Sequence, residues 1–156
     1  MKKFLSMSLV IAMLAMTLTG CGGNGATEGG SDVLKIGATG PLTGGLAYYG
    51  TEVKQGAELA IEEVNAAGGI NGIQVEMNFQ DDEGDTEKVI NAYNTVKDWG
   101  AQLLLGSVTS DPSISVAAET ANDNMFQLTP SGTAEDCIAN DNAFRVCFSD
   151  PEQGLK

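Results

Sequence analysis

Histidine is absent from all 156 residues of the chain. Its imidazole is the usual general base near neutral pH and a common ligand of protein-bound metals. Without it, this segment cannot supply a Ser-His-Asp triad or an imidazole metal site. Two large classes of enzyme site are therefore excluded for these residues.

Basic residues are scarce as well. Eight Lys and Arg residues stand against 21 Asp and Glu residues, which gives a formal net charge of −13. Removing Lys2 and Lys3 with an N-terminal leader leaves six basic and 21 acidic residues, which gives a formal net charge of −15. Nucleic-acid binding depends on cationic side chains that neutralise phosphates. The composition thus excludes a nucleic-acid partner and predicts a well-solvated, soluble surface.

The glycine motifs of nucleotide-binding proteins are also missing. The glycines at 37, 40, 44 and 45 do not fit G-x-G-x-x-G, and the chain has no G-x-x-x-x-G-K-[ST]. The acidic run at 81–85 lacks the sixth-position glycine and the later bidentate glutamate of a calcium loop. We interpret that run as a solvated turn and expect neither a cofactor nor a metal.

The N-terminus carries the features of an exported leader. Lys2 and Lys3 precede the apolar residues 4–16, a run too short to span a bilayer as a mature helix. Small residues then lead to Cys21, and the segment Leu18-Thr19-Gly20-Cys21 resembles the lipobox of bacterial lipoproteins. We expect a signal peptide at 1–20, a lipidated Cys21 and a flexible tether over 21–32. Acyl chains contribute about 0.8 kcal/mol per buried methylene, so the anchor to the cell membrane would be effectively permanent.

Strand-like and helix-like segments alternate between residues 33 and 149. This alternation predicts an α/β domain in which a parallel sheet is flanked by helices. The expected strands cover 33–38, 73–80, 103–105, 125–129 and 143–148. The continuous apolar run at 103–105 is typical of a central strand that is covered on both faces.

Three helices are expected between these strands, and residues 150–156 begin another. The first follows a loop over 39–50 and has an inward stripe of Val53, Ala57, Ala60, Ile61 and Val64. Thr86 is the expected N-cap of the second, with inward residues Val89, Ile90, Tyr93, Val96 and Trp99. Asp111 and Pro112 are expected as N-cap and first-turn residues of the third.

Three loops at expected strand ends combine glycine with hydroxyl side chains. They are TGPLTG with Tyr48 and Tyr49, GSVTSD over 106–111, and TPSGT over 129–133. Open α/β sheets bind ligands beyond the carboxyl ends of their strands, and the last two loops suit a carboxylate. For any single loop, ordinary turn composition explains the residues equally well. The two tyrosines either stack on the apolar part of a ligand or staple the helix start.

Cys137 and Cys147 do not form a metal-binding pattern. In an exported chain they suit a disulfide, which would contribute about 3 kcal/mol in the chain-entropy model. The alternative is a pair of free thiols.

Several segments together resemble a known family. They are similar to the first lobe of type I periplasmic-binding-protein-like lipoproteins for branched-chain amino acids. The segments are KIGATGPLTGGLAYYGTEVKQGAELAIEEVNAAGGING, QDDEGD, LLLGSVTS, FQLTPSGTAED and FRVCFSDPEQG. The resemblance implies an amino-acid receptor that serves an ABC permease and is not an enzyme. It covers the chain from Val33 onwards.

The resemblance also implies a set of ligand contacts. Ser110 corresponds to a hydroxyl donor to the ligand carboxylate, and Ser131 to a main-chain carbonyl that accepts from the ammonium. Thr133 corresponds to a contact through its hydroxyl and its N–H, with Gly132 beside it. Tyr49 corresponds to an aromatic ring against the ligand side chain.

Length is the main departure from this family. The resemblance assigns 33–149 to the N-terminal lobe of a two-lobed fold and 150–156 to the start of a hinge or second-lobe helix. The second lobe is missing from the sequence, so we expect an N-terminal part that binds amino acids weakly or not at all.

Two other functions stay open. A sensory ectodomain for a small amino acid or amide would use the same fold. A lipid-anchored enzyme with Ser110 or Ser131 as nucleophile is disfavoured, because the chain lacks histidine and a G-x-S-x-G elbow.

Overall fold

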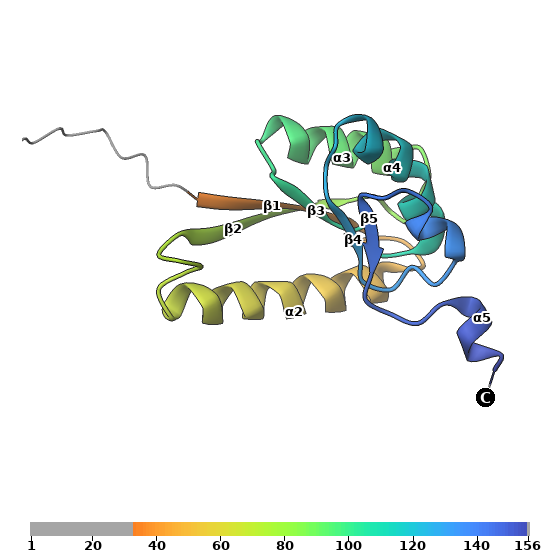
Figure 1. Cartoon of the computed structure of the whole chain (residues 1–156), viewed down its shortest axis with the longest axis horizontal. Coiled ribbons are helices and arrows are strands. Elements are labelled where there is room, and N and C mark those ends of the chain that lie inside the picture. Colours follow the sequence, from red (N-terminus) through yellow and green to blue (C-terminus); the bar gives the residue numbers. More distant parts are fainter. Residues whose placement is uncertain (1–32, 156) are drawn as a thin grey trace, which may run out of the picture. The chain divides into compact units, whose positions relative to one another are not determined.

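A parallel sheet of five strands organises residues 33–155, the part of the chain that the computed structural model describes (Figure 1). The strands are β1 (Val33–Gly40), β2 (Gln74–Asp81), β3 (Leu103–Leu105), β4 (Gln127–Thr129) and β5 (Ala143–Arg145). They lie in the order β2-β1-β3-β4-β5, and all neighbours are parallel. The predicted α/β fold and the central position of β3 are confirmed. The expected leader, Cys21 and tether lie outside the described residues.

Helices connect successive strands. The structure contains α2 (Ala47–Ala66), α3 (Lys88–Asp98), α4 (Ser110–Asn122), a 3-10 helix η1 (Glu135–Ile138) and the short α5 (Asp150–Gln153). In Figure 1, α3 and α4 lie on one side of the sheet and α2 crosses the other side. This arrangement follows from the right-handed crossovers that parallel strands require.

The best-packed core lies between the sheet and the pair α3 and α4. Leu104 on β3 is fully buried there in one cluster with Val89, Tyr93, Val96 and Val116. Its neighbour on β1 is Gly37, where an added Cβ would lie 2.7 Å from a methyl carbon of Val96. Glycine at position 37 therefore lets α3 pack directly on the strand.

The opposite face of the sheet is only partly covered. Helix α2 packs on β1 and β2. At the other edge, Phe126 and Phe144 stack with ring centroids 5.1 Å apart and remain 43% and 48% exposed. Apolar side chains on the β4 and β5 side of the sheet thus remain in contact with solvent within residues 33–155.

Three predicted helix starts are wrong. Helix α2 begins at Ala47, inside the loop expected over 39–50. The N-cap of α3 is Glu87 and not Thr86, and Asp85 Oδ1 accepts from the N–H groups of Glu87 and Lys88 at 2.8 and 2.9 Å. The N-cap of α4 is Thr109 and not Asp111, since Thr109 is the last residue with extended backbone.

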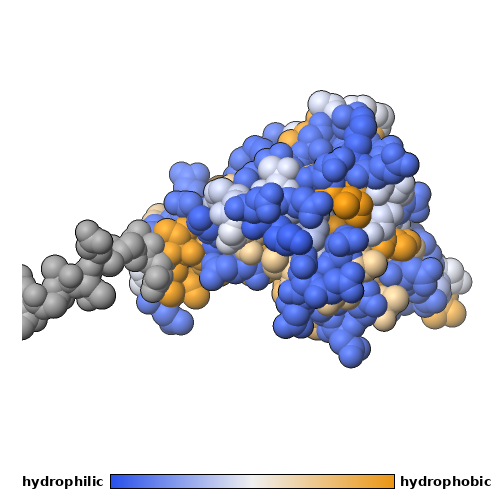
Figure 2. Space-filling view, turned by 90° about the horizontal axis from the view of Figure 1, so that it is seen from above, coloured by the Kyte–Doolittle hydropathy of each residue, from blue (hydrophilic) through white to orange (hydrophobic). Residues whose placement is uncertain are grey.

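Several residues predicted to face inward are only half-buried, and one of them is exposed. Ala60 is exposed, because α2 covers only two strands and buries little beyond a narrow stripe. Trp99 follows the end of α3 and is half-buried, with the Lys35 ammonium 4.9 Å from its ring centroid. Figure 2, which looks onto the side of α3 and α4, shows a mainly hydrophilic surface with small separate apolar patches. That surface agrees with the acidic composition.

Candidate functional site

The loops that follow β3 and β4 lie side by side at the carboxyl ends of the strands. β3 leads through residues 106–109 into α4, and β4 leads through residues 130–134 into η1. This edge of an open α/β sheet is where ligands bind. Hydrogen bonds within and between these loops hold four of the five predicted site residues, namely Ser110, Ser131, Gly132 and Thr133.

Ser110 is the first residue of α4, and its hydroxyl oxygen accepts two backbone hydrogen bonds. Thr133 N–H donates at 3.1 Å and Ala134 N–H at 3.3 Å. A serine hydroxyl has two acceptor positions and one O–H donor. Because both acceptor positions are in use, the O–H is directed away from the 133–134 backbone and is free to donate to a ligand.

The start of α4 is suited to an anion. A helix of 13 residues begins here, and its first N–H groups have no partner within the helix. Thr109, the N-cap, makes no side-chain cap bond, and its Oγ1 is buried without a hydrogen-bond partner. Two polar groups at this helix terminus, the hydroxyl of Thr109 and the O–H of Ser110, therefore have no hydrogen-bond partner within residues 33–155.

The neighbouring loop is held tightly. Ser131 Oγ donates to the carbonyl of Val108 at 2.6 Å, and Gly132 N–H donates to Thr129 Oγ1 at 3.0 Å. An added Cβ at Gly132 would lie 2.7 Å from Thr129 Oγ1 and 2.9 Å from Cys137 Sγ. Glycine is therefore required at position 132 for this loop to close over its neighbours.

Sequence reasoning missed Arg145, which supports the same loop from β5. Its Nη1 donates to the carbonyls of Thr133 and Ala134 at 3.1 and 3.0 Å. The Thr133 carbonyl also accepts from Asp150 N–H at 3.0 Å. A signal was available, because Arg145 is the only arginine in an acidic chain.

Tyr49 stands apart from the polar loops. It lies in the first turn of α2, is 51% exposed and packs edge-on against Tyr48 with ring centroids 5.7 Å apart. Within residues 33–155, no hydrogen bond joins its side chain to the loops after β3 and β4. The structure therefore assembles the polar part of the predicted site and leaves the aromatic part in solvent.

A layer of buried hydroxyl and amide groups lies beneath the two loops. Its fully buried members are Thr39, Ser107, Ser113, Thr120, Gln127 and Thr129. The Ser107 carbonyl accepts from Ser113 Oγ at 2.6 Å and from Thr129 Oγ1 at 2.8 Å. Sequence reasoning did not identify this layer, because isolated hydroxyls at strand ends look like ordinary turn residues.

The acidic turn is only partly a solvated turn, which corrects the sequence interpretation. Asp82 is fully buried, and this burial raises the pKa of its carboxyl. Partial burial also acts to raise the pKa of Asp81, but hydrogen bonds from the Thr43 hydroxyl and Leu42 N–H outweigh that effect and lower it. Asp81 thus ties the turn to the loop after β1.

Cys137 and Cys147 are free thiols in the structure, so the expected disulfide is not formed and the alternative of two free thiols is the one observed. Cys137 Sγ lies 3.7 Å from the carbonyl oxygen of Ser110, and Cys147 Sγ lies 3.5 Å from that of Gly132. Burial raises the pKa of the Cys137 thiol. Each thiol thus has its own backbone acceptor in the site loops.

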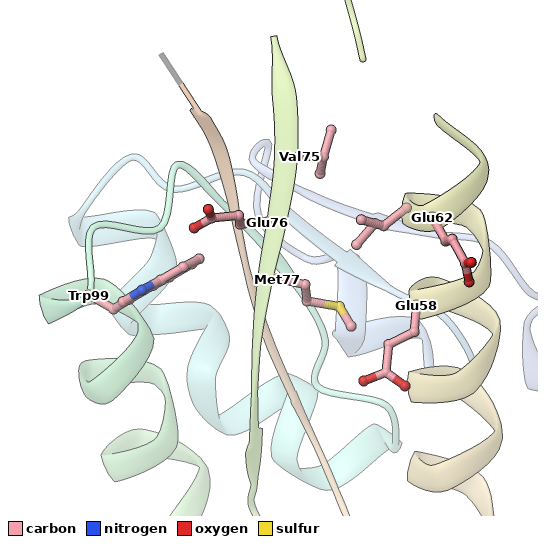
Figure 3. Close-up of a pocket in the computed structure, with 7 residues that line it drawn as sticks. Glu58, Glu62, Val75, Glu76, Met77 and Trp99 are labelled. Atoms are coloured by element: carbon pink, nitrogen blue, oxygen red, sulfur yellow. The ribbon is translucent and has the colours of Figure 1, made fainter. Parts of the chain in front are cut away.

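A separate hollow runs along the outer edge of β2 and shares no residue with the site (Figure 3). It is lined by Ile61, Val75, Met77 and Trp99 together with three carboxylates, those of Glu58, Glu62 and Glu76. In Figure 3 these side chains lie on either side of the strand. The carboxylates would repel an anionic ligand group, so the loops after β3 and β4 remain the better candidate.

Other site types find little support in residues 33–155. No helix there is long and apolar enough to cross a membrane. In the same range, no three His, Cys, Asp or Glu side chains gather as a metal ion would require. Ser110 Oγ and Ser131 Oγ contact only backbone groups, so neither hydroxyl has a side-chain base beside it.

Comparison with known proteins gives consistent matches. The family described as periplasmic binding protein matches residues 33–156. Among relatives, a Leu/Ile/Val-binding protein homolog 3 of Brucella melitensis is 36% identical over 77% of this chain and 33% of its own length. A Leu/Ile/Val-binding protein, BraC3, of Rhizobium johnstonii is 37% identical with the same coverage. The chain therefore spans about a third of the length of these relatives.

Solved structures agree. The branched-chain amino acid transporter substrate-binding protein LivJ of Streptococcus pneumoniae, in complex with isoleucine, matches with a TM-score of 0.71 and 30% identity over 76% of this chain and 35% of its own. An ABC transporter substrate-binding protein of Desulfitobacterium hafniense, in complex with Leu, matches with a TM-score of 0.68 and 28% identity. This match covers 78% of this chain and 36% of the other. A five-stranded parallel sheet, a carboxylate-suited helix start and these matches lead to one conclusion: the chain belongs to the periplasmic binding protein family.

Proposed function

We propose that the chain is the first lobe of an extracytoplasmic receptor that captures a branched-chain or related amino acid for an ABC importer. The observation that carries this proposal is the Ser110 hydroxyl, whose acceptor positions are filled and whose O–H is left to donate. The relatives named as Leu/Ile/Val-binding proteins support the ligand class. The family consists of binding components of transporters, so a receptor and not an enzyme is proposed.

In this proposal the ligand's α-carboxylate lies at the start of α4. It accepts from the Ser110 O–H, which follows the buried and unpartnered hydroxyl of Thr109. Charge-assisted hydrogen bonds of this kind are stronger than neutral ones, and the helix dipole favours the anion. The N–H of Thr133 is already bonded to Ser110, so Thr133 contributes its hydroxyl.

The ammonium group and the side chain occupy the rest of the site. The Ser131 carbonyl accepts from the ammonium, with Gly132 beside it, and the Tyr49 ring covers the apolar side chain. A second lobe would close over the ligand and exclude water. Because one lobe leaves the ligand in solvent, we expect this chain alone to bind leucine in the millimolar range or more weakly.

Amide chemical shifts of the isotope-labelled chain during a leucine titration test the proposal. We expect shifts at residues 109–111 and 131–134, and loss of these shifts in Ser110→Ala. Ser115→Ala is a matched control on the same helix, because its hydroxyl donates only to the Asp111 carbonyl. Shifts confined to other surfaces, or equal responses in both variants, would contradict the proposed ligand contacts. Micromolar affinity for leucine would contradict the expectation that one lobe binds only weakly.

We also propose that Cys21 carries a lipid anchor and that residues 1–20 are removed. The basic residues, apolar run and small residues before Cys21 support this location. Mass spectrometry of the mature protein should find an acylated N-terminal Cys21, and Cys21→Ser should release the protein from membranes. An unmodified mature terminus at another residue would contradict the anchor.

A further inference from the structure

Asp82 is a fully buried carboxyl at the point where β2 leads into the turn before α3. Its Oδ1 accepts from Gly84 N–H at 2.8 Å, and its Oδ2 accepts from the Ser107 hydroxyl. Ser107 belongs to the loop after β3. A turn outside the candidate site is thereby bonded directly to one of the site's two loops.

The bonds continue from Ser107 into the second loop. The Ser107 carbonyl accepts from Ser113 Oγ at 2.6 Å and from Thr129 Oγ1 at 2.8 Å. Thr129 Oγ1 in turn accepts from Gly132 N–H at 3.0 Å. A continuous chain of buried hydrogen bonds therefore connects Asp82 to the segments that carry Ser110 and Gly132.

No basic side chain of the described residues pairs with Asp82. Burial and, to a smaller extent, the like charge of Asp81 raise the pKa of Asp82, and the facing segments 39–40 and 106–109 contain no ionisable residue. Lys88 on α3 pairs instead with Glu83. Burial of a carboxyl without a counter-charge is unfavourable, and the hydrogen bonds from Gly84 and Ser107 are what offset this cost.

We propose that Asp82 is a positioning residue for the ligand site, and that its protonation state sets the geometry of the loops carrying Ser110 and Gly132. The ionised carboxyl accepts from Ser107 and Gly84 together. A proton on Oδ2 would have to be donated to Ser107 Oγ, which reverses that bond and turns the Ser107 hydroxyl. Thr39 Oγ1, which is buried without a partner, lies beside Gly106, the residue before Ser107.

The effect on ligand affinity rests on the proposed function, but the coupling between the loops does not. Burial raises the pKa of Asp82, whereas hydrogen bonds lower the pKa values of Asp81 and Asp85, so Asp82 titrates at a higher pH than these two neighbours. The coupling can thus be measured in the chain without any ligand.

The test follows backbone amide shifts of the whole chain during a pH titration. We expect the amides of Ser107, Ser110, Gly132 and Thr133 to shift with one common midpoint, and this shared shift to be lost in Asp82→Asn. Glu76→Gln removes an exposed carboxyl from the same strand and should leave the shift unchanged. A flat response at the loops, or a shared shift that persists in Asp82→Asn, would overturn the proposal.

A second variant covers the case in which Asp82→Asn does not fold. Ser107→Ala keeps the carboxyl but removes its bond to the loop, so the pH-dependent shift should persist at Gly84 and be lost at Gly132. A shift retained at Gly132 in Ser107→Ala would overturn the proposal. A wild-type chain whose loops titrate together but do not respond to leucine would contradict the proposed leucine contacts of this lobe and leave the positioning role supported.

Discussion

The two parts of the candidate site differ in how firmly the fold holds them. The loops after β3 and β4 are fixed by bonds from Thr129, Ser131 and Arg145, and most of the groups beneath them are fully buried. Tyr48 and Tyr49 are 71% and 51% exposed and contact mainly each other. Under the proposed function, the groups that contact the shared amino-acid backbone are preorganised in this lobe, whereas contacts to the variable side chain depend on closure.

The largest expected effect breaks the rigid part by overpacking it. In Gly132→Ala, the new Cβ would lie less than 3 Å from Thr129 Oγ1 and Cys137 Sγ, so the free energy of unfolding should fall by about 3 kcal/mol. Urea denaturation measures this change. Gly45→Ala is the control, because an added Cβ there meets nothing within 4 Å. Equal stability of the two variants would show that the loop is not tightly packed.

A smaller loss is expected when one buried hydroxyl is removed. Thr129→Val keeps the shape of the side chain but leaves Gly132 N–H without its acceptor and Ser107 with one donor fewer. Unsatisfied buried groups cost about 1 to 3 kcal/mol each, so we expect a loss of about 2 kcal/mol. Hydrogen exchange should become faster at Gly132 while β1 stays protected. Unchanged exchange at Gly132 would contradict the role of Thr129.

Burial of Asp82 makes the stability of the chain depend on pH. A carboxyl whose pKa is raised by folding binds protons more tightly in the folded state, so its contribution to stability is greatest at low pH and is lost as pH rises through the folded pKa. Relative to wild type, Asp82→Asn should therefore gain stability as pH rises from about 4, the unfolded value. Urea midpoints across this range measure the difference, and a constant difference would contradict the assignment.

The smallest effect is expected in the aromatic part. Tyr49→Leu should change the free energy of unfolding by less than about 0.5 kcal/mol, because the ring is half exposed and makes no hydrogen bond to the site loops. It should also leave the pH response of Ser110 and Gly132 intact. A loss comparable to that of Thr129→Val would show that the two parts are not independent.

Sequence patterns predicted the sheet, the central β3 and the loops that form the polar site, because apolar periodicity and glycine-hydroxyl loops depend on local residue order. They did not predict the burial of Asp82, since nothing local separates it from Asp81 and Asp85. The state of Cys137 and Cys147 and the support from Arg145 depend on contacts between separate elements. Helix starts were misplaced by a few residues because Glu87 and Thr109 assume their capping positions only in the folded turns.

In the proposed function, the start of α4 recognises the α-carboxylate of an amino acid. A comparison of leucine with leucine amide, which lacks the carboxylate, tests it most directly. We expect leucine to shift the amide signals of Ser110, Asp111 and Thr133 in the wild-type chain, and leucine amide at the same concentration to leave them unchanged. Equal shifts at these residues from both compounds would contradict it.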